Sequence, residues 1–224
     1  MSASVSANVN ESASGTHVLA LIALPDATLD ALRRGYTLHY HPDGWDAALS
    51  AEVDPANLRA VVTNGSTGLS AAQMAALPAL EIVSAFGAGY ENVDVAAATR
   101  RGIVVTHAPG ANAATVADHA IGLLLALARG YAPLTYAVRA GRWQASRAER
   151  PTLTGARLGL LGMGRIGRLI AARAQGFDMT LGYHARRPHA DAPGRYYAEL
   201  TELAADSDFL VIACNGGAAT RRPA

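Results

Sequence analysis

Short runs of β-branched and other apolar residues alternate with alanine-rich stretches from residue 17 onward. This alternation is typical of strands that cross over through helices into a parallel sheet, so it predicts an α/β fold. The expected strands of the first half cover residues 17–22, 36–40, 60–64, 81–85 and 103–106. The expected helices between them cover residues 27–33, 45–51, 70–76 and 93–101. Strands in this rhythm form one doubly wound domain.

A second strand-and-helix series follows a long apolar helix, which is expected over residues 114–128. Its strands are expected at residues 157–161, 179–184 and 208–213, and the arginine-rich segment 131–151 is expected to be an excursion between domains. The start of the chain is rich in Ser, Ala and Asn and lacks the basic and apolar stretches of a signal peptide. We therefore expect a disordered tail (1–15), a first domain (16–112) and a second domain (113–224).

Small residues follow several of the expected strands, at the edge of the sheet where ligands of doubly wound domains bind. Asn64 and Gly65 follow one strand, and Ala88 and Gly89 follow the next along the chain. A turn of small residues lets a ligand reach backbone N–H groups. The plain alternatives are a tight turn at Ala88 and Gly89 and a strand-end cap at Asn64, and for Asn64 the two readings are nearly balanced.

The run Gly162-Met163-Gly164-Arg165-Ile166-Gly167 fits the G-x-G-x-x-G pattern of dinucleotide-binding domains. It directly follows the apolar strand 157–161 and opens a helix, which is the context that this motif requires. Its glycines permit a tight turn, an approach of backbone to a pyrophosphate and close packing of helix on strand. The free N–H groups of the helix then face the phosphates.

The next expected strand, 179–184, ends where an acidic residue would bind the ribose 2′-hydroxyl of NAD. No acid stands there, and Arg186 and Arg187 follow instead. Guanidinium groups suit a phosphate through their bidentate geometry, so the pair favours NADP(H) over NAD(H). The alternative is that one or both arginines point into solvent.

Composition removes several functions. The 19 basic residues are all arginine, which excludes the lysine-dependent chemistry of Schiff-base enzymes, P-loop nucleotidases and short-chain dehydrogenases. A net charge of +1 lacks the excess of positive charge that binding to nucleic acid or an anionic membrane requires, and we expect neither as a partner. The single cysteine, Cys214, cannot form an internal disulfide, which favours a cytoplasmic location, and no Cys/His cluster has metal-ligand spacing.

Four segments together resemble the D-isomer-specific 2-hydroxyacid dehydrogenases. They are 86–94, 101–112, 115–119 and 162–167, in the order and spacing of that family, and the resemblance extends over residues 17–221. It is strongest to the branch of glyoxylate and hydroxypyruvate reductases. The resemblance implies a flavodoxin-like substrate domain and a Rossmann domain, hydride transfer to a small 2-keto acid, and a homodimer in the full-length form.

Site residues follow from the same resemblance. Ala88 and Gly89 would present N–H groups to the substrate carboxylate, with Asn64 and Gly65 lining the pocket. Thr115 would approach the nicotinamide side of the cofactor. The remaining cofactor-binding residues would be Gly162, Gly164, Arg165, Ile166, Gly167, Arg186, Arg187, Cys214 and Asn215. The two residues after the last expected strand would contact the adenine half, Cys214 through its backbone.

The chain departs from the family in one respect. The family orients the keto acid with an arginine and donates the proton from a Glu-His pair, and we expect all three beyond residue 224, so no catalytic residue is assigned. His107 at a strand end is the weaker candidate for a proton donor. We expect the chain alone to be inactive and its Rossmann domain to be incomplete, with strand 157–161 as an open edge and the second half loosely ordered. The alternative is a non-enzymatic dinucleotide-binding protein.

Overall fold

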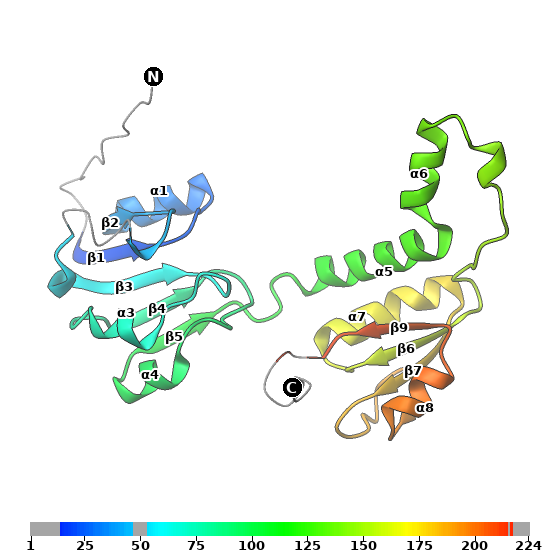
Figure 1. The fold of residues 1–224 in the computed structure, drawn as a ribbon. Coiled ribbons are helices and arrows are strands. Elements are labelled where there is room, and N and C mark those ends of the chain that lie inside the picture. Colours follow the sequence, from blue (N-terminus) through cyan, green and yellow to red (C-terminus); the bar gives the residue numbers. More distant parts are fainter. Residues whose placement is uncertain (1–13, 47–52, 215, 217–224) are drawn as a thin grey trace. The chain divides into compact units, whose positions relative to one another are not determined.

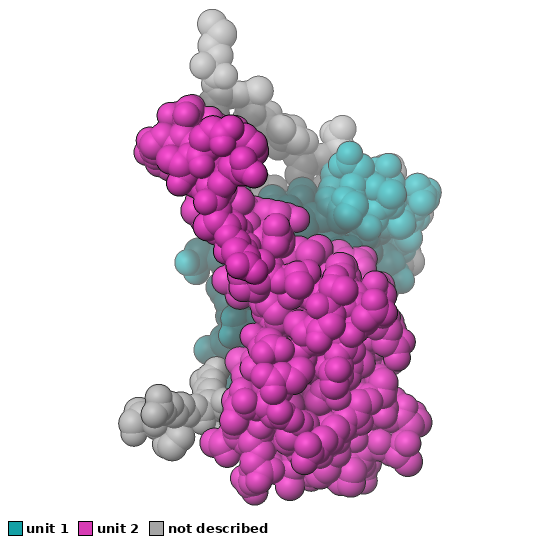
Figure 2. Space-filling view, turned by 90° about the vertical axis from the view of Figure 1, so that its right-hand side faces the viewer, with its two compact units in different colours: residues 1–111 teal, residues 112–224 magenta. Residues whose placement is uncertain are grey.

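The computed structural model describes residues 14–46, 53–214 and 216 of the chain. The chain divides into two units, residues 1–111 and 112–224, which Figure 2 colours separately. Both units consist of a parallel sheet with helices packed on it, which confirms the predicted α/β class. Residues 1–13 of the expected tail and most of the helix expected at residues 45–51 fall outside the described residues, whereas Ser14 and Gly15, which were assigned to the tail, begin the first strand.

The first unit contains a five-stranded parallel sheet in the order β2-β1-β3-β4-β5 (Figure 1). Its strands are β1 (Ser14–Ala20), β2 (Tyr36–Tyr40), β3 (Leu58–Thr63), β4 (Ile82–Ala85) and β5 (Val104–His107). Its helices are α1 (Asp26–Gly35), α3 (Ala71–Ala75) and α4 (Val95–Arg100), with a 3-10 turn at Pro55–Asn57. The strands predicted from the sequence are therefore all present, with ends shifted by at most three residues.

Burial on both faces explains why these strands read as continuous apolar runs. Successive residues of β1 and its extension alternate between two core clusters, with Leu19 on one face and Ala20 on the other. Leu29 of α1 packs in the cluster of Ala20, whereas Met74 of α3 and Ala98 of α4 pack in that of Leu19. Figure 1 shows the same arrangement, with α1 on one side of the sheet and α3 and α4 on the other.

The second unit begins with the helices α5 (Ala113–Arg129) and α6 (Tyr131–Arg139). A four-stranded parallel sheet follows in the order β8-β7-β6-β9. Its strands are β6 (Arg157–Leu161), β7 (Thr180–His184), β8 (Arg195–Tyr197) and β9 (Phe209–Ile212), and its helices are α7 (Arg165–Ala174) and α8 (Leu200–Ala205). Two 3-10 turns lie at Gln144–Ser146 and Gln175–Phe177. The core forms where α5 and α7 pack on one face of the sheet.

The prediction that strand 157–161 is an open edge is wrong. β6 is paired on both sides, with β7 through Leu160↔Tyr183 and with β9 through Leu160↔Val211. The error arose because β9 was counted as the third strand of the unit, whereas β8 is the third and β9 the fourth. β8 was missed because it has three residues and follows Gly194, so pairing with β7 rather than local propensity makes it a strand.

Segment 131–151 is also more regular than expected, since its first part forms α6. Pro133 lies in the first turn of that helix, where a missing N–H group costs no helical hydrogen bond.

α5 is less buried than its composition suggests. It packs Ala117, Ile121 and Leu124 into the core but leaves Leu127 75% exposed. No single described helix is apolar and long enough to cross a membrane; α5 and α6 pass that test only as a pair bent by 56°.

We predict that the first unit loses stability in mild acid through His39. Its Nε2 lies 3.0 Å from Nδ1 of His17, and burial, followed by the charges of His17 and His41, lowers the pKa of His39 from its ordinary 6.5. The unfolded chain therefore binds a proton at a higher pH than the folded chain, so stability falls as pH decreases from about 6.5 toward the folded pKa. The measurement is the urea midpoint between pH 7.5 and pH 5.

His39→Gln is the test variant, and it should flatten this pH dependence. His119→Gln serves as the control, because His119 is an exposed histidine of α5 in the other unit. Equal pH dependence in the wild type and in His39→Gln would contradict the prediction.

Candidate functional site

The glycine motif forms a tight turn between β6 and α7. Gly162 has φ +103°, and its N–H donates to the carbonyl oxygen of His184 at the end of β7 (2.9 Å). A Cβ on Gly162 would lie 2.8 Å from the backbone nitrogen of Cys214, just beyond β9. A Cβ on Gly167 would overlap the carbonyl oxygen of Gly162. Both glycines are therefore required by backbone contacts, and the ends of β6, β7 and β9 meet at this turn.

Gly164 has a different environment, because a Cβ there would meet nothing within 4 Å. It is the N-cap of α7, and no side chain caps the helix. Ile166 packs against the core, whereas Arg165 is exposed. The open space at Gly164 and the uncapped N–H groups of the first turn of α7 fit a pyrophosphate, which the helix dipole also favours.

The two arginines that follow β7 are exposed. Within the described residues, Arg186 and Arg187 form no hydrogen bond or ion pair. Their guanidinium groups face solvent beyond the end of β7, where a phosphate could reach them. Thr115 is exposed in the first turn of α5, which lies against α7 because Arg173 donates to the carbonyl of Ala114 (3.4 Å). Asn215 lies outside the described residues.

In the first unit, the turns after β3 and β4 lie against each other. A Cβ on Gly65 would be 2.8 Å from the carbonyl carbon of Gly89, so only glycine permits this approach. Asn92 continues the contact, since its N–H donates to the carbonyl of Gly65 (3.2 Å) and its side-chain amide donates to the carbonyl of Ser66 (2.8 Å). The structure thus brings together Gly65 and Gly89, which the sequence placed on separate strand ends.

The N–H groups of Gly65, Ala88 and Gly89 donate to no other group among the described residues. Backbone N–H groups without a protein acceptor can bind a small anion without a cationic side chain when they face the same point. The carboxylate of Glu91 lies beside Gly65 and Gly89, where it would meet a Cβ on either residue. Glu91 is therefore a neighbour of the candidate anion site that the sequence analysis did not identify.

Asn64 takes the cap role that the sequence left open. Its side-chain oxygen accepts a hydrogen bond from the N–H of Thr67 (2.7 Å), and its carbonyl accepts one from Gly68 (2.8 Å).

His107, which the sequence offered as a weaker candidate for a proton donor, has a structural contact that was not expected. Its Nδ1 donates to the carbonyl of Ala88 (2.9 Å), and the ring of Tyr90 meets it edge-on at 4.7 Å. His107 therefore holds the turn that carries Ala88 and Gly89. No local sequence pattern predicts this hydrogen bond, because the two residues are far apart in the chain.

Comparison with known proteins agrees with this geometry. The family model for the catalytic domain of D-isomer specific 2-hydroxyacid dehydrogenases matches residues 18–221. The chain belongs to that family. Glyoxylate/hydroxypyruvate reductase A of Arabidopsis thaliana is 40% identical over 159 residues, which are 70% of this chain and 51% of the plant protein. Glyoxylate/hydroxypyruvate reductase B of Escherichia coli is 35% identical over 203 residues, which are 85% of this chain and 61% of that protein.

Solved structures of this 2-hydroxyacid dehydrogenase family share the fold. An NADPH-dependent glyoxylate/hydroxypyruvate reductase from Sinorhizobium meliloti, solved with NADP and malonate, has a TM-score of 0.81 and 35% identity. The match covers 92% of this chain and 65% of that one. The chain spans about half the length of the curated relatives that it matches first, since the shares are 51%, 52% and 49%.

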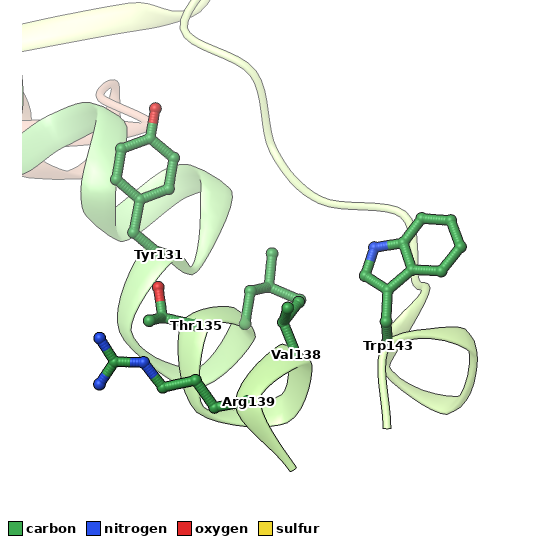
Figure 3. A pocket seen from close by; sticks show the side chains of 6 residues that line it. Tyr131, Thr135, Val138, Arg139 and Trp143 are labelled. Atoms are coloured by element: carbon green, nitrogen blue, oxygen red, sulfur yellow. The ribbon is translucent and has the colours of Figure 1, made fainter. Parts of the chain in front are cut away.

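An apolar hollow lies apart from these turns. It has a volume of about 460 Å³ and is lined by Tyr131, Leu134, Thr135, Val138, Arg139 and Trp143. Figure 3 shows that Trp143 comes from the segment after α6 and stands opposite the side chains of that helix. None of these six lining residues belongs to the substrate or cofactor sites predicted for this chain.

We predict that Gly68→Ala disrupts the turn that carries Gly65. Gly68 has φ +67°, and a Cβ there would overlap the backbone of Asn92. Left-handed backbone costs about 1–2 kcal/mol in a non-glycine residue, and overpacking adds about 1–3 kcal/mol. Gly102→Ala is the matched control, because Gly102 has φ +70° but open space around it. Urea unfolding should give a larger loss for Gly68→Ala than for the control, and equal losses would contradict the proposed backbone contact.

Proposed function

We propose that the protein is an oxidoreductase that reduces a small 2-keto acid, such as glyoxylate or hydroxypyruvate, with NADPH. The observation that carries the proposal is the turn at residues 162–167, where two glycines allow close backbone contacts and Gly164 leaves open space at an uncapped helix start. Its relatives in Arabidopsis thaliana and Escherichia coli are named glyoxylate/hydroxypyruvate reductases, which supports the substrate class.

The chain's own residues would bind and orient both reactants. A bound nicotinamide supplies a hydride for the keto carbon. The N–H groups at the start of α7 hold the pyrophosphate, and Arg186 and Arg187 hold a 2′-phosphate. The N–H groups of Gly65, Ala88 and Gly89 receive the substrate carboxylate, and His107 keeps the turn of Ala88 in place.

We assign no proton donor within the described residues. The hydrogen bond from Nδ1 of His107 to the carbonyl of Ala88 fixes the imidazole ring, and we propose a positioning role for this residue. General acid catalysis typically contributes about 10²–10⁴-fold to the rate. We accordingly propose that the 224-residue chain alone binds the cofactor without appreciable turnover.

The cofactor assignment predicts that NADPH binds to this chain more tightly than NADH. The double variant Arg186→Ser/Arg187→Ser should weaken NADPH binding by about 10- to 100-fold, the range expected for lost hydrogen bonds to a charged group, and leave NADH binding unchanged. The measurement is fluorescence titration of the purified chain with each cofactor. Arg33→Ser/Arg34→Ser is the control, because it removes an adjacent, exposed arginine pair from α1 in the other unit.

Two outcomes would contradict the assignment. An unchanged preference in the Arg186/Arg187 variant would exclude contact with the 2′-phosphate, and an equal loss in the Arg33/Arg34 variant would indicate a general effect of charge. Glyoxylate or hydroxypyruvate is then added to the NADPH complex. Rapid NADPH oxidation would overturn the proposed lack of a proton donor, whereas absence of any dinucleotide binding would overturn the proposed function itself.

We also propose that the protein forms a homodimer through α5 and α6. Large apolar side chains on these helices and on the segment after them are more than half exposed; they are Leu123, Leu127, Tyr131, Tyr136, Val138 and Trp143. Figure 1 shows α6 extending from the end of α5, away from the sheet of its unit. Large apolar side chains that gather on a surface often mark a protein interface, and the second copy of the chain is the occupant that we propose.

The dimer proposal predicts that Leu127→Glu/Tyr136→Glu yields a folded monomer, because burying two carboxylates in an apolar interface is unfavourable. Sedimentation equilibrium of the wild type should give a dimer. Leu200→Glu in α8, where Leu200 is 37% exposed, is the control and should remain dimeric. A wild-type chain that sediments as a monomer at every concentration would contradict the proposal.

A further inference from the structure

The loop that carries Arg186 and Arg187 is held in place by hydrogen bonds and an ion pair. It connects β7 with β8 and covers residues 185–194. The hydroxyl of Tyr183, a side chain only 2% exposed, accepts a hydrogen bond from the N–H of His189 (2.9 Å) and donates one to the His189 carbonyl (3.2 Å). Tyr196 of β8 donates to the carbonyl of Ala185 (3.3 Å). Both strands that flank the loop therefore hold it through tyrosine hydroxyls.

A third attachment comes from α7. Arg168 forms a bidentate ion pair with Asp191, with distances of 2.9 Å from Nη2 to Oδ1 and 3.1 Å from Nη1 to Oδ2. Nη1 also lies 3.3 Å from the carbonyl oxygen of Asp191. The guanidinium holds the pKa of Asp191 below its ordinary value, so the carboxylate stays charged at neutral pH.

Arg168 lies next to the glycine motif, so the ion pair connects that motif with the loop. Arg168 follows Gly167 directly, and its own N–H donates to the carbonyl of Gly164 (3.0 Å). One end of the ion pair is therefore fixed in the first turn of α7, beside the proposed pyrophosphate site. The other end is in the loop that presents Arg186 and Arg187. The pair connects the two groups of residues that an NADP molecule would contact at once.

We propose that Arg168 and Asp191 are positioning residues that set the preference for NADP over NAD by fixing the loop of Arg186 and Arg187. The inference rests on the proposed function, because it concerns the same cofactor site. A fixed loop loses less conformational entropy when a phosphate binds, so the gain appears as affinity. Asp191 is 81% exposed, and exposed ion pairs add little to global stability. The pair should therefore affect specificity more than folding.

The alternative role for Arg168 is direct contact with the 2′-phosphate, and it predicts the opposite effect. If Asp191 merely occupied a phosphate-binding arginine, Asp191→Asn would release Arg168 and strengthen NADP⁺ binding. If the pair positions the loop, the same variant weakens NADP⁺ binding. The sign of this change therefore separates the two roles.

The experiment measures Kd for NADP⁺ and for NAD⁺ by calorimetry on the 224-residue chain and its variants Arg168→Gln, Asp191→Asn and the double variant. We expect each single variant to weaken NADP⁺ binding by about 2- to 5-fold, the range of an exposed ion pair, with NAD⁺ binding unchanged. The double variant should be no weaker than either single variant, because both remove the same interaction. Arg168→Lys keeps the charge and should recover part of the affinity.

Arg173→Gln is the matched control. Arg173 lies on the same helix and pairs with Asp118 of α5, so its loss removes an ion pair without touching the loop. Hydrogen exchange provides a readout independent of cofactor. The amide of Ala192, which donates to the carbonyl of His189 (3.2 Å), should exchange faster in Arg168→Gln and Asp191→Asn but not in the control.

The outcomes separate this inference from the proposed function. A wild-type chain without preference for NADP⁺ overturns the proposed cofactor and this inference with it. A wild-type preference that depends on Arg186 and Arg187 but survives Arg168→Gln overturns the inference alone. Stronger NADP⁺ binding in Asp191→Asn, additive losses in the double variant, or an equal loss in Arg173→Gln would also overturn it.

Discussion

The second unit depends on one backbone contact, the close approach of Gly167 in α7 to the carbonyl of Gly162 at the end of β6. A side chain at either position would push the helix away from the strand, because Gly162 is also confined by the backbone beyond β9. The contact aims the first turn of α7 at the edge where β6, β7 and β9 end. The N–H groups, the arginine loop and the end of β9 consequently surround a single small region.

The proposed substrate site of the first unit depends on the same kind of close backbone contact between glycines. Gly65 and Gly89 follow adjacent strands and pack backbone against backbone, with the carboxylate of Glu91 beside both. Backbone N–H groups suit a carboxylate but cannot distinguish one small acid from another. In the proposed substrate site, selectivity would therefore come from nearby side chains, which include Glu91, Tyr90 and His107.

The elements that could be predicted are those with a local cause. Apolar strands buried on both faces and glycines that follow them were readable in the sequence, as were Arg186 and Arg187 after β7. β8 was not, since its three residues become a strand only by pairing with β7. The open edge was predicted wrongly for the same reason, because without β8 the strand β9 was counted as the third strand rather than the fourth, which pairs with β6. Contacts between distant residues, such as Arg168 with Asp191 and His107 with Ala88, had no sequence signal at all.

This division between backbone and side chains has a consequence for how the two properties of the proposed cofactor site could change. The glycines are required by the fold and would also serve the pyrophosphate, so substitution at Gly162 or Gly167 would damage both. Arg186 and Arg187 are exposed, and the ion pair that holds their loop is itself largely in solvent. Substitutions in this loop or its ion pair should have little effect on the free energy of unfolding, because exposed ion pairs contribute little to stability. In the proposed cofactor site, preference could therefore shift through the loop while the glycine turn continued to serve dinucleotide binding.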